Sequence, residues 1–209
     1  MNAHISIMSR AGWSQVDSER DVSEADQVLG NPILSGALRL WFGLCRKGQL
    51  PLREDLDTLI LRPDIFPRIV LLEGVERGGR RDLRYRLFGT GLANNLGADL
   101  TRHYVRDVFD DATYAEEMIS ICWRAIDRKQ PIAASGQYLP ADPASAPTAT
   151  CRLFLPLRPL PSGTPLLLLC PVYISSGEIV ERAIRDLSAY VPGDTIAFTD
   201  RMAGRGQAK

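Results

Sequence analysis

The side chains that could perform catalysis are few and lie far apart in the sequence. Histidine occurs only as His4 and His103, and there is no GxSxG or HExxH motif and no Cys/His cluster with metal-binding spacing. His103 lies in residues 101–104 (TRHY), where a surface position at a helix start is favoured over a role as ligand or base. We therefore predict no catalytic residue and no metal site. A small-molecule enzyme that uses Tyr85, Tyr104 or His103 in a cavity remains a third hypothesis.

Glycine and aspartate residues suggest two other kinds of site. The GTG sequence at residues 89–91 lies between a predicted strand and a helical segment, where a phosphate-binding loop could lie. The dinucleotide pattern would need a third glycine near Asn94, and the Walker lysine is missing, so we interpret this segment as a turn. Asp107, Asp110 and Asp111 could bind a cation, but capping of the next helix explains them more simply.

A local basic strip lies on one predicted hairpin. The formal net charge of the chain is zero, so no field from the whole protein attracts nucleic acid. Base-stacking aromatic residues do not accompany the strip, and we interpret it as a solvated strand face rather than a nucleic-acid site. The strip consists of Arg77, Arg80, Arg81, Arg84 and Arg86.

The cysteines and apolar runs indicate a cytoplasmic protein. Cys45, Cys122, Cys151 and Cys170 lie far apart among apolar neighbours, which is typical of reduced, buried thiols. Residues 1–30 lack the apolar region of a secretory signal. The longest apolar run is far shorter than the roughly 20 residues of a membrane span, so we predict no membrane insertion.

Hydrophobic periodicity predicts an α+β domain in residues 31–174. Two apolar runs flank Gly78 and Gly79, which predicts a hairpin, and three further strands follow at residues 132–139, 149–157 and 165–174. An apolar stripe with helical spacing predicts one long helix from Ala115 to Lys129. Strands grouped in this way, with helices between them, indicate one antiparallel sheet.

The two ends of the chain are predicted to lie outside this domain. Residues 1–30 are expected to be a flexible leader, residues 175–190 a C-terminal helix, and residues 191–209 a flexible tail. Asn31 and Pro32 are typical of the start of a helix, which would cover the second sheet face. Its apolar stripe supplies our candidate subunit interface: Leu34, Leu38, Trp41, Phe42 and Cys45.

A candidate ligand pocket follows from the apolar residues expected between the sheet, the short helices and the long helix. A packed core without ligand is an equally favoured interpretation, although half-covered sheets often hold a ligand at this place. The candidate residues are Tyr85, Leu87, Leu92, Leu96, Tyr104, Val108, Phe109, Met118, Ile119 and Cys122.

The sequence resembles PAS domains over roughly residues 32–174. The similarity lies in residues 85–92 (YRLFGTGL), 96–101 (LGADLT) and 105–109 (VRDVF). Residues 41–52 and 61–71 also resemble the lead-in of a bacterial PAS-like subfamily in which the domain forms nearly the whole protein. The resemblance implies a five-stranded antiparallel sheet. Short helices and one long helix would lie on one face of it, and an N-terminal helix on the other.

The cofactors of known PAS branches do not fit the residues present. The flavin-binding branch needs a cysteine in the helix that here contains Asn94 and Asn95, and haem-binding members have a histidine on the long helix, where residues 115–129 contain none. Arg102 also stands where the family often has glycine. The cofactor therefore stays unknown, and a flavin photoadduct and haem are both disfavoured.

The resemblance implies a non-enzymatic, cytoplasmic sensory or regulatory module. It would bind a small ligand or a protein partner and act on an unknown signalling protein in trans, because no output segment is visible. PAS domains also imply a homodimer. The alternative is a homodimeric protein-interaction scaffold that binds no ligand.

Overall fold

The structure is a computed structural model, and it describes residues 18–46, 48–56, 65–109, 112–140, 147–175, 178–179 and 187–200. Asp110, Asp111 and His4, which the sequence raised as candidates, lie outside these ranges.

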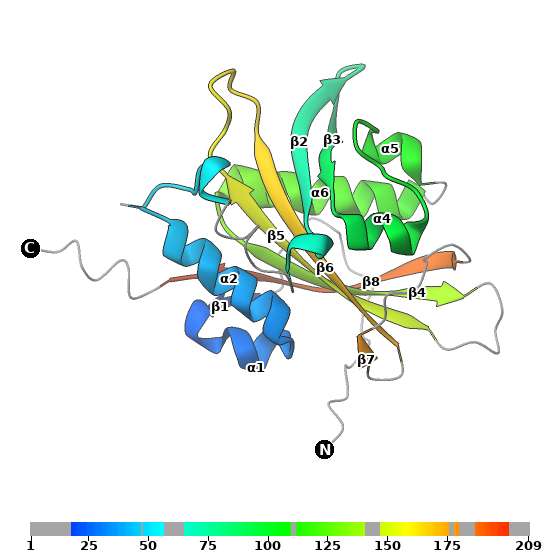
Figure 1. The fold of residues 1–209 in the computed structure, drawn as a ribbon, viewed down its shortest axis with the longest axis horizontal. Helices are drawn as coiled ribbons and strands as arrows, with labels where there is room; N and C mark the ends of the chain where they lie inside the picture. Colours follow the sequence, from blue (N-terminus) through cyan, green and yellow to red (C-terminus); the bar gives the residue numbers. More distant parts are fainter. Residues whose placement is uncertain are drawn as a thin grey trace, which may run out of the picture.

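A single twisted sheet organises the described part of the chain (Figure 1). Its order is β1-β8-β4-β5-β6-β2-β3, with β7 paired to β6, and every pair is antiparallel except the parallel pair of β1 and β8. The strands are β1 (Ser18–Asp21), β2 (Val70–Arg77), β3 (Arg80–Phe88), β4 (Ile132–Pro140), β5 (Thr148–Leu157), β6 (Leu166–Ser175), β7 (Glu178–Ile179) and β8 (Leu187–Thr199).

The prediction of a five-stranded antiparallel PAS-like sheet is wrong. Among the described residues the sheet is mixed and has eight strands, because β8 adds to the edge of β4, β1 adds in parallel to β8, and the short β7 pairs with β6. The hairpin and the three later strands lie where the hydrophobic alternation predicted them. In the turn between β2 and β3, Gly78 and Gly79 have φ angles of 58° and 74°, the left-handed conformation that a tight hairpin favours.

The predicted C-terminal helix and tail are also wrong where the structure describes them, because residues 187–199 form β8. Pro192 and Gly193 are residue types that often end a helix. They instead lie where the register with β4 shifts, with Ala134 opposite Thr195 and Gly136 opposite Pro192. A proline has no N–H group to donate to a neighbouring strand. It is tolerated here because β1 pairs only with residues 196–199 of β8, so among the described residues no strand pairs with Pro192 on that side.

Residues 18–29 are likewise ordered elements rather than part of a flexible leader. After β1, Asp21 and Glu24 form a reciprocal capping box that starts a 3-10 helix, η1 (Val22–Glu24), and α1 (Ala25–Leu29) follows directly. Each element is too short for its periodicity to be recognised in the sequence.

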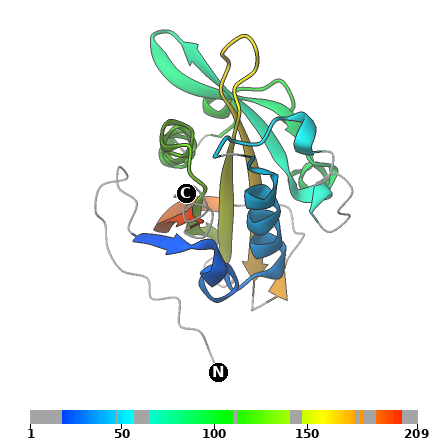
Figure 2. The same ribbon diagram turned by 90° about the vertical axis from the view of Figure 1, so that its left-hand side faces the viewer.

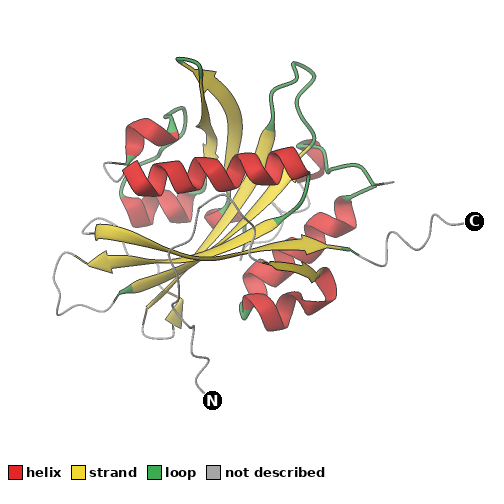
Figure 3. Ribbon diagram, turned by 180° about the vertical axis from the view of Figure 1, so that it is seen from behind, coloured by secondary structure: helices red, strands yellow, loops and turns green. Residues whose placement is uncertain are grey.

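The helices cover both faces of the sheet. Besides η1 and α1, the described helices are α2 (Pro32–Leu44), η2 (Glu54–Leu56), η3 (Phe66–Arg68), α4 (Thr90–Leu96), α5 (Val105–Val108) and α6 (Ala112–Arg128). Figure 2 shows α6 and α2 on opposite faces of the sheet, and Figure 3 shows α6 crossing the strands. Asn31 caps α2 as predicted, because its side chain accepts hydrogen bonds from the backbone N–H groups of Ile33 and Leu34 at 3.0 and 3.2 Å.

Two hydrophobic cores result, one on each face. The α6-side core includes Leu83, Tyr85, Met118 and Phe154, and the α2-side core includes Leu38, Trp41, Leu153 and Phe198. Consecutive residues Leu153 and Phe154 enter different cores because side chains alternate across a strand.

Candidate functional site

Eight of the ten predicted pocket residues lie in or against the α6-side core. Five of them are buried in the α6-side core: Tyr85, Leu92, Met118, Ile119 and Cys122. Three are partly buried and pack against that core: Leu96, Val108 and Phe109. The remaining two, Leu87 and Tyr104, lie elsewhere.

Leu87 packs against the α2-side core because a β-bulge changes the phase of β3. The register runs from Leu71 opposite Leu87 to Leu72 opposite Tyr85, so Arg86 is an extra residue in β3. Tyr85 and Leu87 therefore lie on opposite faces although they are two residues apart. The expectation that both line one pocket is wrong, and the sequence alone did not reveal the bulge.

Tyr104 lies at the outer edge of the sheet, away from the α6-side core. It forms an isolated bridge with Arg84, and the guanidinium of Arg77 lies 4.3 Å from the centre of its ring. His103 next to it is exposed, and its Nδ1 lies 3.2 Å from the carbonyl oxygen of Thr101. Neither side chain reaches the interior, so the structure offers no support for a catalytic role.

The GTG segment is a site of close packing. A Cβ atom at Gly89 would lie 2.5 Å from the carbonyl oxygen of Pro67 and 2.8 Å from that of Ile69, and the Gly89 N–H donates to the Ile69 carbonyl at 2.9 Å. Glycine is required because β3 and α4 pass directly over η3.

Gly89→Ala should therefore lower the free energy of unfolding by about 1–3 kcal/mol, because the contacted atoms are backbone and cannot rotate away. Gly43→Ala is the matched control. A Cβ atom at Gly43 would meet no described atom within 4 Å beyond its own helix and chain neighbours, and alanine in a helix is favoured by up to about 1 kcal/mol. In urea denaturation, the unfolding midpoint should fall for Gly89→Ala and rise for Gly43→Ala. Equal changes of the midpoint would contradict the packing argument.

A charged network that the sequence analysis did not identify lies in the α6-side core. Arg152 on β5 is 1% exposed and Glu117 on α6 is 3% exposed, and Nη2 of Arg152 donates to Oε2 of Glu117 at 2.8 Å. The same nitrogen donates to the hydroxyl of Tyr190 on β8, which in turn donates to Oε1 of Glu117 at 3.2 Å. The network thus connects α6 to two strands of the sheet.

Part of the Arg152 guanidinium lacks acceptors. Among the described residues, no hydrogen-bond partner reaches its Nε or Nη1, although both atoms are buried. The hydroxyl of Thr150, which is two residues away on the same face of β5 and 3% exposed, also has no partner among those residues. Buried polar atoms without partners are rare and costly, so this pair indicates a place where another molecule can supply acceptors.

Aromatic rings surround the guanidinium. It lies 4.9 Å from the ring centre of Tyr190, 5.4 Å from that of Tyr114 and 5.8 Å from that of Phe154. Tyr138 packs 5.1 Å from Tyr190, so the network lies among packed aromatic rings. Gly136 makes room for this arrangement, because a Cβ there would lie 2.1 Å from the Tyr190 hydroxyl.

Burial makes this core sensitive to alkaline pH. It raises the pKa of the Tyr138, Tyr173 and Tyr190 phenols above their ordinary value of 10.0, and it raises the pKa of the Cys151 thiol, which packs against the opposite core, from 9.0 to about 11. The unfolded chain therefore loses these protons at lower pH than the folded chain.

Below about pH 8.5 these groups are protonated in both the folded and the unfolded chain, so the free energy of unfolding is at its full value. We expect it to fall as the pH rises from about 9 to 11. Urea midpoints measured at neutral pH and at about pH 10.5 test this expectation. An unchanged midpoint would show that the phenols are not held neutral in the folded protein.

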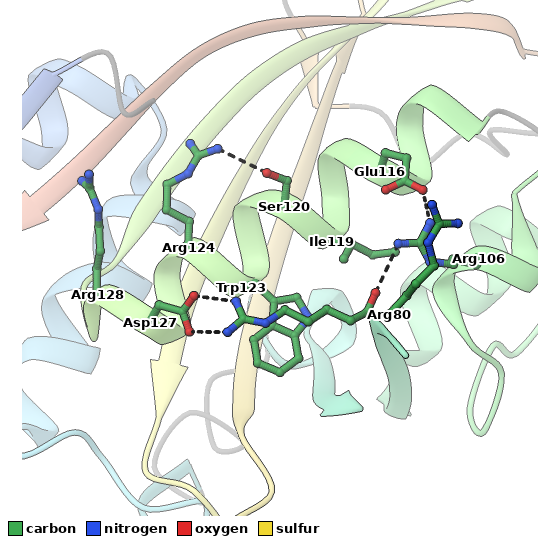
Figure 4. Close-up of a pocket in the computed structure, with 10 residues that line it drawn as sticks. Arg80, Arg106, Glu116, Ile119, Ser120, Trp123, Arg124, Asp127 and Arg128 are labelled. Atoms are coloured by element: carbon green, nitrogen blue, oxygen red, sulfur yellow. Dashed lines mark hydrogen bonds and ion pairs between the residues drawn. The ribbon is translucent and has the colours of Figure 1, made fainter. Parts of the chain in front are cut away.

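An open groove lies on the other side of α6, between this helix and the tip of the β2–β3 hairpin (Figure 4). Its volume is about 700 Å³. The lining residues are Arg80, Arg81, Arg106, Glu116, Ile119, Ser120, Trp123, Arg124, Asp127 and Arg128. Two arginines of the predicted basic strip thus line a concave surface instead of a plain solvated strand face.

The other arginines of that strip are engaged in ion pairs. Arg84 and Arg86 both contact Glu73, which is 3% exposed, the second at 2.7 Å. Arg77 makes two hydrogen bonds to Asp107 at 2.6 and 2.8 Å, which lowers the pKa of the Asp107 carboxyl below its usual value. Asp107 is therefore held by an arginine instead of being available for a cation.

The candidate interface residues of α2 are mostly inside the protein. Leu34, Leu38 and Trp41 are buried against the sheet, and Nε1 of Trp41 donates to the carbonyl oxygen of Pro156 at 2.9 Å. Phe42 and Cys45 are partly buried and pack against the same core. The stripe that suggested an interface is the face that holds α2 on the sheet, so the first three residues are not on the surface.

Comparisons with known proteins leave the chain without an assigned relative. No family model, curated protein or solved structure matches it.

Within the described ranges, no three His, Cys, Asp or Glu side chains are grouped to hold a metal ion. Among the described helices, none has the length and apolar character that a membrane span requires. The resemblance to PAS domains stays a prediction from the motifs.

Arg152 could have been noticed in the sequence. Residues 148–157 alternate between faces, and Arg152 falls in phase with Phe154, which places a charge on an inward position of a mostly apolar strand. Glu117 similarly falls within the inward stripe of α6. Opposite charges on inward positions of β5 and α6 therefore indicate, from the sequence, that Arg152 and Glu117 form a pair between these two elements.

Proposed function

We propose that this chain is a non-enzymatic regulatory module that binds a small neutral molecule in the α6-side core and signals to a protein partner. The observation that carries the proposal is that three buried polar atoms, Nε and Nη1 of Arg152 and Oγ1 of Thr150, have no hydrogen-bond partner among the described residues. The ligand would accept hydrogen bonds from both, between the surrounding aromatic rings.

The charge balance of the site favours a neutral ligand. Glu117 already compensates Arg152 at 2.8 Å, so a buried carboxylate ligand would leave one uncompensated negative charge. The free N–H groups and the hydroxyl instead suit carbonyl or hydroxyl oxygens, and the tyrosine rings suit a flat apolar body. We therefore propose a planar ring compound that carries carbonyl oxygens.

The position of the network supports a regulatory role. Arg152, Glu117 and Tyr190 belong to β5, α6 and β8, so a ligand that draws Arg152 toward itself would weaken the contacts that hold α6 on the sheet. A ligand of this kind changes the balance between two packings of α6 by its difference in affinity for them. We propose that the module acts in the cytoplasm, which is consistent with its four free cysteines.

Thermal-shift measurements with a metabolite library divided into neutral carbonyl compounds and carboxylic acids test the proposal. At a concentration of 100 times Kd, a ligand stabilises the protein by about 2.7 kcal/mol. We expect one or more neutral compounds to stabilise the wild-type protein, and we expect Thr150→Val to lower their affinity while preserving the fold. Thr164→Val, in the β5–β6 turn, is the matched control.

Two outcomes would overturn the proposal. One is that no compound of either class stabilises the protein. The other is that a stabilising compound binds wild-type protein, Thr150→Val and Arg152→Lys equally well, since it would then bind elsewhere.

A further inference from the structure

We propose that the groove on the outer side of α6 binds an acidic segment of a partner protein. This proposal is independent of the ligand in the core. It rests on the shape of the groove, on its charge, and on the fixed positions of Arg81 and Arg106 (Figure 4).

The groove is strongly positive in a chain without net charge. Among the described residues, its lining contains five arginines and two carboxylates, Glu116 and Asp127. Arg80 and Arg128 make no ion pair with any described residue, and Figure 4 shows Arg124 and Arg128 extending from the same side of α6. The local excess of positive charge selects a negatively charged partner and raises its rate of association.

Two of the arginines, Arg81 and Arg106, are already held in place. Arg81 pairs with Asp127 at 2.6 Å and its guanidinium lies 4.3 Å from the ring centre of Trp123. Arg106 pairs with Glu116 and donates to the carbonyl oxygen of Arg81 at 3.2 Å. The buried Nε of Arg106 has no partner among the described residues. Side chains that are ordered before binding lose less entropy when a partner arrives.

The lining favours a protein segment over nucleic acid. Glu116 and Asp127 lie among the arginines and would repel a continuous line of phosphates, whereas a peptide can place its carboxylates between them. Arg81 covers one face of Trp123, which limits stacking of a base. Ile119 and Trp123 are the apolar side chains of the described lining, and they suit one large apolar side chain of the segment.

The groove and the buried network share the helix α6. Glu116 and Glu117 are neighbours on α6, the first in the groove and the second in the buried network. A movement of α6 would therefore change the groove and the core together.

The test uses the full chain and a short fluorescein-labelled peptide of aspartate and glutamate residues around one leucine–phenylalanine pair. We expect saturable fluorescence anisotropy that weakens as salt rises. The double variant Arg80→Glu/Arg128→Glu should bind about tenfold more weakly, because each reversal replaces attraction by repulsion. Neither side chain takes part in an ion pair with a described residue, so the fold should be preserved.

The control is Arg20→Glu/Arg53→Glu, which makes the same change of charge at exposed positions outside the groove. It should bind the peptide as the wild-type protein does. The proposal is overturned if the peptide does not bind saturably, or if both double variants lose affinity equally. It is also overturned if a single-stranded oligothymidine binds more tightly than the peptide with the same dependence on Arg80 and Arg128.

Discussion

Glu117→Ala should lower the free energy of unfolding by about 3–5 kcal/mol, because it leaves the buried guanidinium of Arg152 without its counter-charge. Removal of one partner of a buried ion pair costs more than the pair itself contributes. The measurement is urea denaturation followed by circular dichroism at neutral pH.

Two further variants test whether the unpaired charge of Arg152 causes the loss of stability in Glu117→Ala. Glu116→Ala removes the neighbouring carboxylate, which is 59% exposed and pairs with Arg106 at the surface, and it should cost at most about 1 kcal/mol. The double variant Glu117→Leu/Arg152→Met removes both charges and should recover most of the lost stability. If Glu117→Ala and Glu116→Ala cost the same, the network is not buried as described.

Trp41→Ala should cost about 3–5 kcal/mol, because the indole is one of the largest fully enclosed side chains of the α2-side core. It also loses the hydrogen bond from Nε1 to the carbonyl oxygen of Pro156. The variant should show a lower thermal midpoint and a lower urea midpoint.

Phe42→Ala is the control for this prediction, because Phe42 follows Trp41 on α2 but is only partly buried, and its cost should be clearly smaller. Light scattering separates this account from the interface hypothesis. A Trp41 variant that keeps its stability and changes only its subunit count would contradict the burial of the indole.

Local signals in the sequence were sufficient for the central strands and the long helix. Gly78-Gly79 between alternating apolar runs predicted the β2–β3 hairpin, and the stripe from Ala115 to Ile126 predicted α6. These elements are long, and each buries one clear face, so pattern and structure agree.

Other elements could not be recognised because long-range pairing decides them. Residues 187–199 contain Pro192 and Gly193, which favour a break in any regular element, and β8 forms because β4 accepts them across a bulge. The position of Leu87 depends in the same way on the bulge at Arg86. A single extra residue reverses the face of every later side chain, and no local pattern reports it.

The candidate pocket was predicted from apolar residues, whereas the polar residues identify the better site. Tyr85, Met118 and Cys122 are buried in the α6-side core. Arg152 and Thr150 lie on the same side of the sheet and carry the unsatisfied hydrogen-bonding groups. For locating a candidate site, the inward charge of Arg152 on β5 is therefore more informative than the apolar residues of the predicted pocket.

A crystallographic electron density map of protein purified without denaturation tests the central claim most directly. We expect density for an organic molecule whose oxygen atoms accept hydrogen bonds from Nε or Nη1 of Arg152 and lie within reach of Oγ1 of Thr150. If ordered waters alone satisfy these three atoms, the network is a hydrated structural ion pair, and the proposal of a ligand site in the core is wrong.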